Sequence, residues 1–134
     1  MDDEYMFGRK KIGLIGVTVR TFKVSDDKSE ATICGSKDDG AEGKLVRYKL
    51  RCEQECCSST WIEDVHELSS LIGHTILAVE DLPMIKEEDD PEVSGNYVTF
   101  YGFTMRTEIG VCTIDFRNSS NGYYGGSLIL EKLA

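Results

Sequence analysis

The stretch Ser58–Gly73, SSTWIEDVHELSSLIG, decides the fold class, because its apolar residues have the spacing of a helix. Thr60 suits the N-cap position, and Glu63 three residues later completes a capping box. One apolar stripe recurs at helical spacing and consists of Trp61, Val65, Leu68 and Ile72. Gly73 stands where the first residue after a helix is often a glycine. The pattern predicts a helix over about 61–72 that packs one face on a sheet.

The sequence on both sides of this segment is rich in β-branched and aromatic residues, which is typical of strands. The predicted strands are 14–24, 30–36, 45–52, 74–82, 97–107, 111–118 and 123–133. Three strands, one helix and four strands predict an α+β domain with a largely antiparallel sheet of about six to seven strands and one helix packed on it. This single domain spans 10–134, and 1–9 form a flexible N-terminal tail.

The strand at 14–24 changes phase part-way along its length. Phe22 falls on the opposite face from Val19, which predicts a β-bulge near Arg20 or Thr21. A short polar turn follows and predicts a hairpin with the next strand. The aromatic strand at 97–107 is apolar on both faces, so it is either a central strand or part of a surface for homo-oligomer formation.

The chain is acidic, and its acidic residues are concentrated in one segment. The formal net charge is −9, and residues 52–92 hold twelve acidic residues against one basic residue, Lys86. Such a segment disfavours direct nucleic-acid binding, because phosphates need a basic surface. It suits a basic protein surface as partner. A solvated surface that keeps the protein soluble is the alternative interpretation.

The most acidic part of this segment is 83–96, PMIKEEDDPEVSGN. Few of its side chains favour burial, so it is predicted to be a mobile acidic loop. With the end of the preceding strand it forms a candidate protein-binding surface. That surface consists of Glu80, Asp81, Glu87, Glu88, Asp89, Asp90 and Glu92.

The stretch 118–127, NSSNGYYGGS, allows two interpretations. Asn121-Gly122 predicts a hairpin turn between the last two strands. A bulge at Gly125-Gly126 then brings Phe116 opposite Leu128, which corrects a register that otherwise places leucines across from polar residues. Alternatively, tyrosine rings stack on a ligand that the glycines allow to approach closely.

In the second interpretation the ligand is a small nucleotide-like molecule whose phosphate binds backbone N–H groups at the predicted helix N-terminus. The candidate ligand site consists of Arg117, Asn118, Ser119, Ser120, Tyr123, Tyr124, Gly125, Gly126, Ser58 and Thr60.

The five cysteines are Cys34, Cys52, Cys56, Cys57 and Cys112. Their odd number favours free thiols in a reducing compartment. Cys56 and Cys57 precede the predicted helix N-terminus, so they are reactive thiolates, metal ligands or simply buried. Their spacing is not that of a zinc site, and we expect no metal and no cofactor. No nucleophile with its base and no phosphate-binding glycine loop stands out, so we expect no enzyme activity.

No apolar stretch is long enough to span a membrane, and the first residues lack the apolar core of a signal peptide, which predicts a cytoplasmic protein without membrane contact. The stretches CCSSTW (56–61) and RNSSNGYYGG (117–126) together resemble a family of small bacteriophage proteins of unknown function. The resemblance covers roughly 45–130 and implies action in the cytoplasm of a bacterial host.

From this resemblance we expect a non-enzymatic protein that counters a host defence system. In the first hypothesis it binds and blocks a host protein with a basic surface through the acidic residues. In the alternatives it sequesters a small nucleotide-like signalling ligand, or it is a thiol-dependent enzyme.

Overall fold

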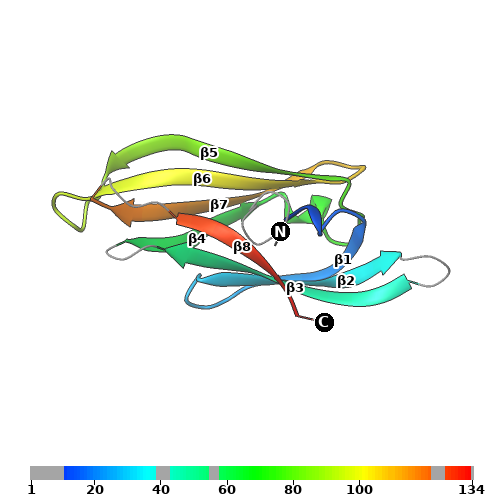
Figure 1. The fold of residues 1–134 in the computed structure, drawn as a ribbon. Coiled ribbons are helices and arrows are strands. Elements are labelled where there is room, and N and C mark those ends of the chain that lie inside the picture. The colour runs from blue at the N-terminus through cyan, green and yellow to red at the C-terminus, as the bar shows by residue number, and fades with distance from the viewer. Residues whose placement is uncertain (1–10, 39–42, 55–57, 122–125, 134) are drawn as a thin grey trace, which may run out of the picture.

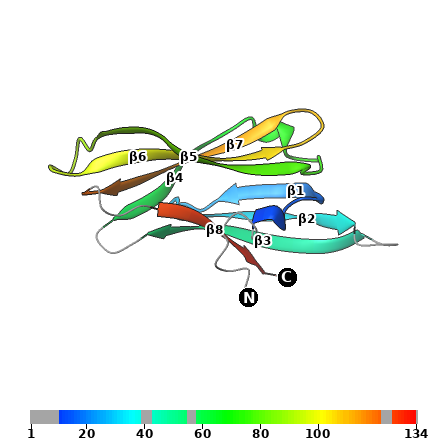
Figure 2. The same cartoon turned by 45° about the horizontal axis from the view of Figure 1, so that its top comes forward.

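The computed structural model describes residues 11–38, 43–54, 58–121 and 126–133, with only the backbone of 38, 54, 83 and 84. Eight strands form two four-stranded antiparallel sheets, which pack face to face as a β-sandwich (Figures 1 and 2). Sheet A has the order β1 (Val17–Val24), β2 (Glu30–Asp38), β3 (Gly43–Gln54), β8 (Gly126–Lys132). Sheet B has the order β4 (Ser59–His66), β7 (Val111–Ser120), β6 (Tyr97–Arg106), β5 (Ala78–Asp89).

The hydrophobic core lies between the two sheets. Alternate residues of the strands point into it, as the pleat of a strand requires, except where a bulge shifts the alternation. Ile33 and Leu50 of sheet A and Phe103 and Ile114 of sheet B are fully buried there. Outside the strands, Leu14 closes part of the same core.

The predicted helix over 61–72 is wrong, and with it the α+β fold class. Ser59–His66 form β4, which pairs antiparallel with β7 and carries a bulge between Ile62 and Asp64. Only a 3-10 turn, η2 (Leu68–Ser70), follows, and Glu67 before it has a left-handed φ of 61°, which no helix tolerates. Pairing with β7 overrides the local helical pattern, so the described part of the chain is an all-β sandwich.

The mobile loop predicted over 83–96 is wrong in its first half. Strand β5 continues to Asp89 and pairs with β6, with an irregularity between Leu82 and Lys86. The turn that follows is closed by a hydrogen bond of 3.0 Å from the backbone N–H of Asp90 to the carbonyl of Asn96. Because β5 is an edge strand, its acidic side chains stay in water, and charge there also blocks pairing with a foreign strand.

The predicted hairpin between the last two strands is also wrong. Strand β8 pairs with β3 in sheet A, whereas β7 lies between β4 and β6 in sheet B. The chain therefore crosses from one sheet to the other after Ser120. Leu128 and Leu130 face the same core from the opposite layer, so their burial does not need β7 as partner. Of the predicted turn and bulge, 122–125 lie outside the described residues.

Other local predictions are confirmed. The hairpin of β1 and β2 forms, and its register shifts between Val19 and Thr21, as the phase change in the sequence indicates. Strand β6 is a central strand, one of the two alternatives that its apolar faces indicate, and it forms a hairpin with β7. The predicted strand at 74–82 begins later, at Ala78. Its first residues instead run along β1, where the N–H of Val19 donates to the carbonyl of His74.

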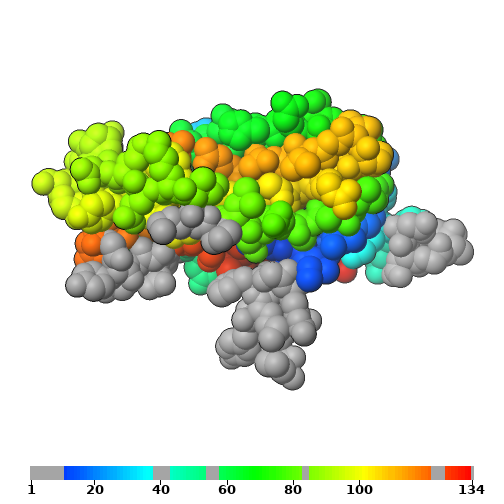
Figure 3. All heavy atoms as spheres, turned by 90° about the horizontal axis from the view of Figure 1, so that it is seen from above, coloured from blue at the N-terminus to red at the C-terminus, as the bar shows by residue number. Residues whose placement is uncertain are grey.

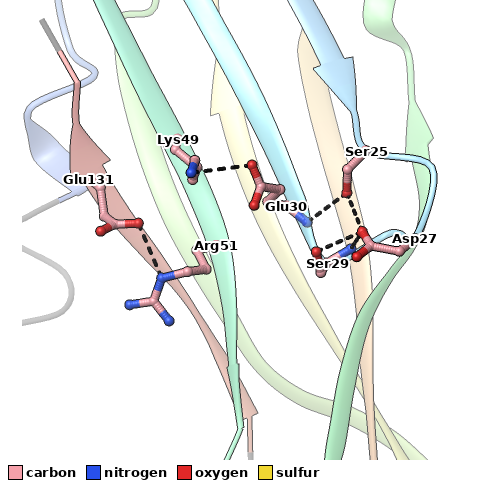
Figure 4. A network of polar contacts seen from close by, with 7 residues as sticks. All are labelled: Ser25, Asp27, Ser29, Glu30, Lys49, Arg51 and Glu131. Carbon is pink, nitrogen blue, oxygen red and sulfur yellow. Dashed lines mark hydrogen bonds and ion pairs between the residues drawn. The ribbon is translucent and has the colours of Figure 1, made fainter.

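The outer face of sheet A carries charged residues that pair across strands (Figure 4). Lys49 lies 3.4 Å from Glu30, and Arg51 donates to Glu131 at 3.1 Å. The ions are partly exposed, so each pair contributes little to stability. At the end of this face, Asp27 in the β1–β2 turn accepts hydrogen bonds from the hydroxyls of Ser25 and Ser29 (Figure 4).

Between about pH 4 and pH 2, the stability of the Asp27→Asn variant is expected to fall less with decreasing pH than that of the parent. The hydrogen bonds from Ser29 and Ser25 lower the pKa of Asp27 from 3.8 to about 2 in the folded chain. Stability from this group is therefore present above the unfolded pKa and is lost as the pH falls through the folded one. Urea midpoints measured from pH 5 to pH 2 should fall less steeply in the variant. Asp26→Asn is the control, because Asp26 accepts none of these bonds, and its profile should match the parent.

Candidate functional site

The outer face of sheet B carries a row of aromatic and basic side chains in cross-strand register. Trp61 of β4 pairs with Arg117 of β7, Arg117 with Phe100 of β6, and Phe100 with Lys86 of β5. Trp61, Arg117 and Phe100 alternate with neighbours that face the other side of their strands and therefore point away from the sandwich, and Lys86 lies over the ring of Phe100 on the same face. Figure 3 shows this face, with β4, β7, β6 and β5 following one another across it.

The cations of this row lie against the ring of Phe100. The guanidinium of Arg117 is 4.1 Å from the ring centroid, and Lys86 Nζ is 5.4 Å from it. Two carboxylates balance the charge of Arg117: Glu63 at 3.6 Å and Asp115 at 3.4 Å. Its Nε is buried without a hydrogen-bond partner. Arg117 is thus held in place by stacking and ion pairing together.

A first hollow of about 460 Å³ opens on this face next to the β5–β6 turn. Trp61, Phe100 and Arg117 line it from the sheet. The acidic residues in its wall are Glu88, Asp89, Asp90 and Glu92. The hollow thus contains four predicted protein-binding residues together with Arg117 and Ser119 from the predicted ligand site.

Asp90 shapes the turn at the edge of this hollow. Its carboxylate accepts hydrogen bonds from the backbone N–H groups of Glu92 at 2.8 Å and Val93 at 3.3 Å, and from the hydroxyl of Ser119. These bonds, the one from Ser119 first, lower the pKa of Asp90. Asp90 therefore stabilises the turn that presents its acidic neighbours.

The other predicted protein-binding residues lie farther along β5. Glu80 is exposed on the outer face. Asp81 pairs at 2.6 Å with Lys11, whose side chain is buried over the ring of Phe103. Glu87 accepts a hydrogen bond of 3.3 Å from Thr99. Asp81 and Glu87 thus have structural partners, as does Glu88, which lies 2.5 Å from Lys86, and the acidic surface is smaller than the sequence predicts.

The predicted ligand-site residues divide between the two faces of β7. Arg117 and Ser119 point outward, whereas Asn118 is fully buried and donates from Nδ2 to the hydroxyl of Thr60 at 2.9 Å. Ser58 and Ser120 are buried as well. Tyr123, Tyr124 and Gly125 lie outside the described residues.

Gly126 closes the inner part of this predicted ligand site. A Cβ at Gly126 would lie 2.0 Å from Thr60 Oγ1, so the backbone of β8 rests directly on this residue. The pairing of Thr60 with Asn118 brings two of the predicted segments together, as expected of one site. They meet in packed contact, however, rather than around an open space.

A second hollow, of about 270 Å³, lies over Gly102 on the same outer face, and sequence reasoning missed it. Gly102 leaves a gap in the centre of the sheet, and Phe100 forms a wall shared with the first hollow. The remaining walls include Ile85 and Thr113. Ile85 is 61% exposed, which is unusual for an isoleucine. A glycine inside an aromatic strand is the signal that could have indicated a close approach here.

Three of the five cysteines fall within the described residues, and none of them forms a disulfide. Burial raises the pKa of Cys52 to about 12 and that of Cys112 to about 11. These two thiols stay protonated near neutral pH and are poor nucleophiles. Cys56 and Cys57, the predicted reactive pair, lie outside the described residues. Within the described ranges no group of three or more His, Cys, Asp or Glu side chains is placed to hold a metal ion.

Fold and site together define the chain as a two-sheet antiparallel β-sandwich protein with an acidic, aromatic hollow on one outer face. The chain belongs to the family DUF7448, described as a domain of unknown function, which it matches over residues 19–130. The match runs from β1 into β8 and so takes in every strand. Comparison with curated proteins and with solved structures finds no match. No helix in the described ranges has the length and apolar character to cross a membrane.

Proposed function

We propose that the chain is a non-enzymatic binding protein that blocks a protein partner with a basic surface, and that the outer face of sheet B is its binding face. The observation that carries this proposal is the first hollow, where Trp61 and Phe100 lie beside Glu88, Asp89 and Glu92. Aromatic rings attract lysine and arginine side chains through cation–π contacts, and carboxylates pair with them.

The distribution of charge between the two sheets supports this choice of face. The strands of sheet B contain eight acidic and three basic residues, whereas those of sheet A contain four acidic and eight basic residues. A basic partner is therefore attracted to one side of the sandwich and repelled from the other. Such attraction orients the encounter, raises the association rate and weakens with added salt.

The resemblance to small bacteriophage proteins suggests where this partner occurs. In the proposal it is a bacterial host protein of a defence system, and its basic surface is a groove that normally holds nucleic acid. An acidic sandwich that occupies such a groove competes with the phosphates for the same basic side chains. No catalysis by the chain is required.

The alternative function, sequestering a nucleotide-like ligand, has less support. Arg117, its cation, is already neutralised by Glu63 and Asp115 and shares its hollow with acidic side chains. A phosphate would therefore meet net negative charge there.

Neutralising the wall of the first hollow should abolish partner capture. In the triple variant Glu88→Gln, Asp89→Asn and Glu92→Gln, loss of three negative charges should weaken binding about tenfold or more at physiological salt. Asp90 is left intact because it stabilises the turn. The measurement is capture of proteins from bacterial lysate on the tagged chain, identified by mass spectrometry and then quantified with the purified partner.

The matched control removes three charges from the other side of the sandwich: Asp26→Asn, Glu53→Gln and Glu131→Gln. It changes the net charge equally and should bind like the parent. If both variants lose partner binding equally, the effect is due to the overall net charge, and the assignment of the binding face to sheet B is refuted. Unchanged capture by the first variant would contradict the proposed function itself.

A further inference from the structure

The second hollow is an exposed apolar depression on a sheet face that no other described segment covers. Its floor is Gly102, where an added Cβ would lie 3.1 Å from a methyl group of Leu82 and 3.5 Å from one of Ile85, so only a glycine lets these two side chains pack this close to the sheet. Ile85 stands at its edge with 61% of its surface exposed. An apolar recess rimmed by polar residues is the usual form of a pocket that anchors a side chain of a partner.

We infer that this hollow binds an apolar side chain of the same basic partner, which presents a cationic and an apolar residue together. The inference rests on the proposed function, because the acidic character of the face fixes the partner as basic. Lys86 and Asp115 both lie in the wall of this hollow, so its own charge is balanced, whereas Glu88, Asp89 and Glu92 lie in the wall of its neighbour. The negative charge of the first hollow therefore favours a basic segment over an acidic one, and the second hollow adds an apolar surface beside it.

The register of β6 gives the spacing that the partner must match. Val98 lines the first hollow and Gly102 lines the second, with the ring of Phe100 between them. At roughly 3.4 Å per residue, these two positions are about 14 Å apart along the strand. An extended segment covers that distance in four residues, so its cationic and apolar side chains stand four positions apart.

The two hollows have different roles in binding. Charges on the rim act at long range and set the association rate and its salt dependence. Burial of an apolar side chain acts only after contact and sets the dissociation rate. A substitution in this protein that blocks the second hollow should therefore raise the dissociation rate of the partner about tenfold without changing its association rate.

The probes are nine-residue peptides of serine and threonine with blocked ends. One carries an arginine and a leucine four positions apart, one has the leucine replaced by serine, one has the arginine replaced by glutamine, and one has the two residues adjacent. Binding to the full chain is followed by ¹H–¹⁵N NMR, which locates weak binding. The first peptide should shift the amides of Gly102 and Thr113 and bind about tenfold more tightly than each of the others.

The Thr113→Trp variant tests the hollow from the side of the protein. Thr113 points outward from β7 into the wall of the hollow, so a tryptophan there fills it without entering the core. Thr32→Trp is the matched control, because Thr32 lies on the outer face of the central strand β2 in the other sheet. Ile85→Ser removes the exposed wall instead. The first and third variants should bind the arginine–leucine peptide about tenfold more weakly, and the control should bind like the parent.

The outcomes separate this inference from the proposed function. Shifts that are confined to the β5–β6 turn and are equal for the leucine and serine peptides would refute the binding of an apolar side chain in the second hollow. The proposal of a basic partner would then still stand. Shifts at Gly102 that are the same for the arginine and glutamine peptides would support binding of an apolar side chain there. They would contradict the proposal that the partner is basic. If no peptide shifts the outer face of sheet B, both proposals fail. A Thr113→Trp variant that binds the first peptide like the parent would likewise refute the anchor.

Discussion

Replacing Ile62 with alanine is expected to lower the free energy of unfolding by about 3 kcal/mol, while Trp61→Ala lowers it by less than about 1 kcal/mol. Ile62 is 1% exposed and belongs to the core, whereas its neighbour Trp61 lies on the outer face of β4. Large-to-small changes in a core remove buried contacts and leave a cavity. Urea unfolding of the two variants at neutral pH measures the difference.

A helix over 61–72 would give the opposite order. There Trp61 would belong to the buried stripe with Val65, and Ile62 would lie beside it, so Trp61→Ala would be the more costly change. That result would contradict β4. Val111→Ala, on an exposed strand position of the same sheet, is the control and should change stability little. Trp61→Ala should instead weaken partner binding, because Trp61 lines the first hollow.

The bulge in β4 explains why this segment looks helical in the sequence. Ile62 is paired with Phe116 and Val65 with Ile114, so both point into the core. They are three residues apart, although strand alternation alone would place same-face residues two or four apart. The extra residue between them reproduces the i, i+3 spacing of a helix. A bulged strand and an amphipathic helix thus share a pattern over this short distance.

Local features of the fold could be predicted, and the assignment of strands to sheets could not. The β1 bulge and the β1–β2 hairpin depend on residues close in sequence, and both predictions are confirmed. Strand β8 depends on β3, which is far from it in the chain. The hairpin predicted for β7 and β8 needed a bulge to bring leucines opposite apolar partners. That mismatch was itself an indication that β8 belongs to the other sheet.

The same limit applies to the candidate site. Composition alone indicates the acidic wall of the first hollow, because its residues are consecutive along 88–92. The second hollow is formed by Ile85, Gly102 and Thr113, from three different strands. Only the pairing of β5 with β6 and of β6 with β7 brings them together. Its detection therefore required the register of the sheet.

Gly126→Ala is expected to lower the free energy of unfolding by about 3 kcal/mol, because an added methyl group has no room at this position. The Cβ would lie 2.0 Å from Thr60 Oγ1 and 3.0 Å from Asn118 Nδ2. Neither side chain can move away without breaking the hydrogen bond between them. Asn118 is fully buried and donates to Thr60. Gly43→Ala, at a strand position with no atom within 4 Å of the new Cβ, is the matched control and should be nearly neutral.

A double-mutant cycle with Thr60→Ala tests whether this close approach causes the loss. Thr60→Ala alone removes the acceptor of the Asn118 hydrogen bond and should cost about 1 to 2 kcal/mol. It also removes Thr60 Oγ1, the atom nearest to the added Cβ, so Gly126→Ala should cost about 1 kcal/mol or more less in its presence than in the parent. Additive losses in urea unfolding would show that β8 does not rest on Thr60. A smaller loss in the double variant than the sum of the two single losses would mean that a glycine is required at position 126. There β8 of sheet A contacts β4 of sheet B.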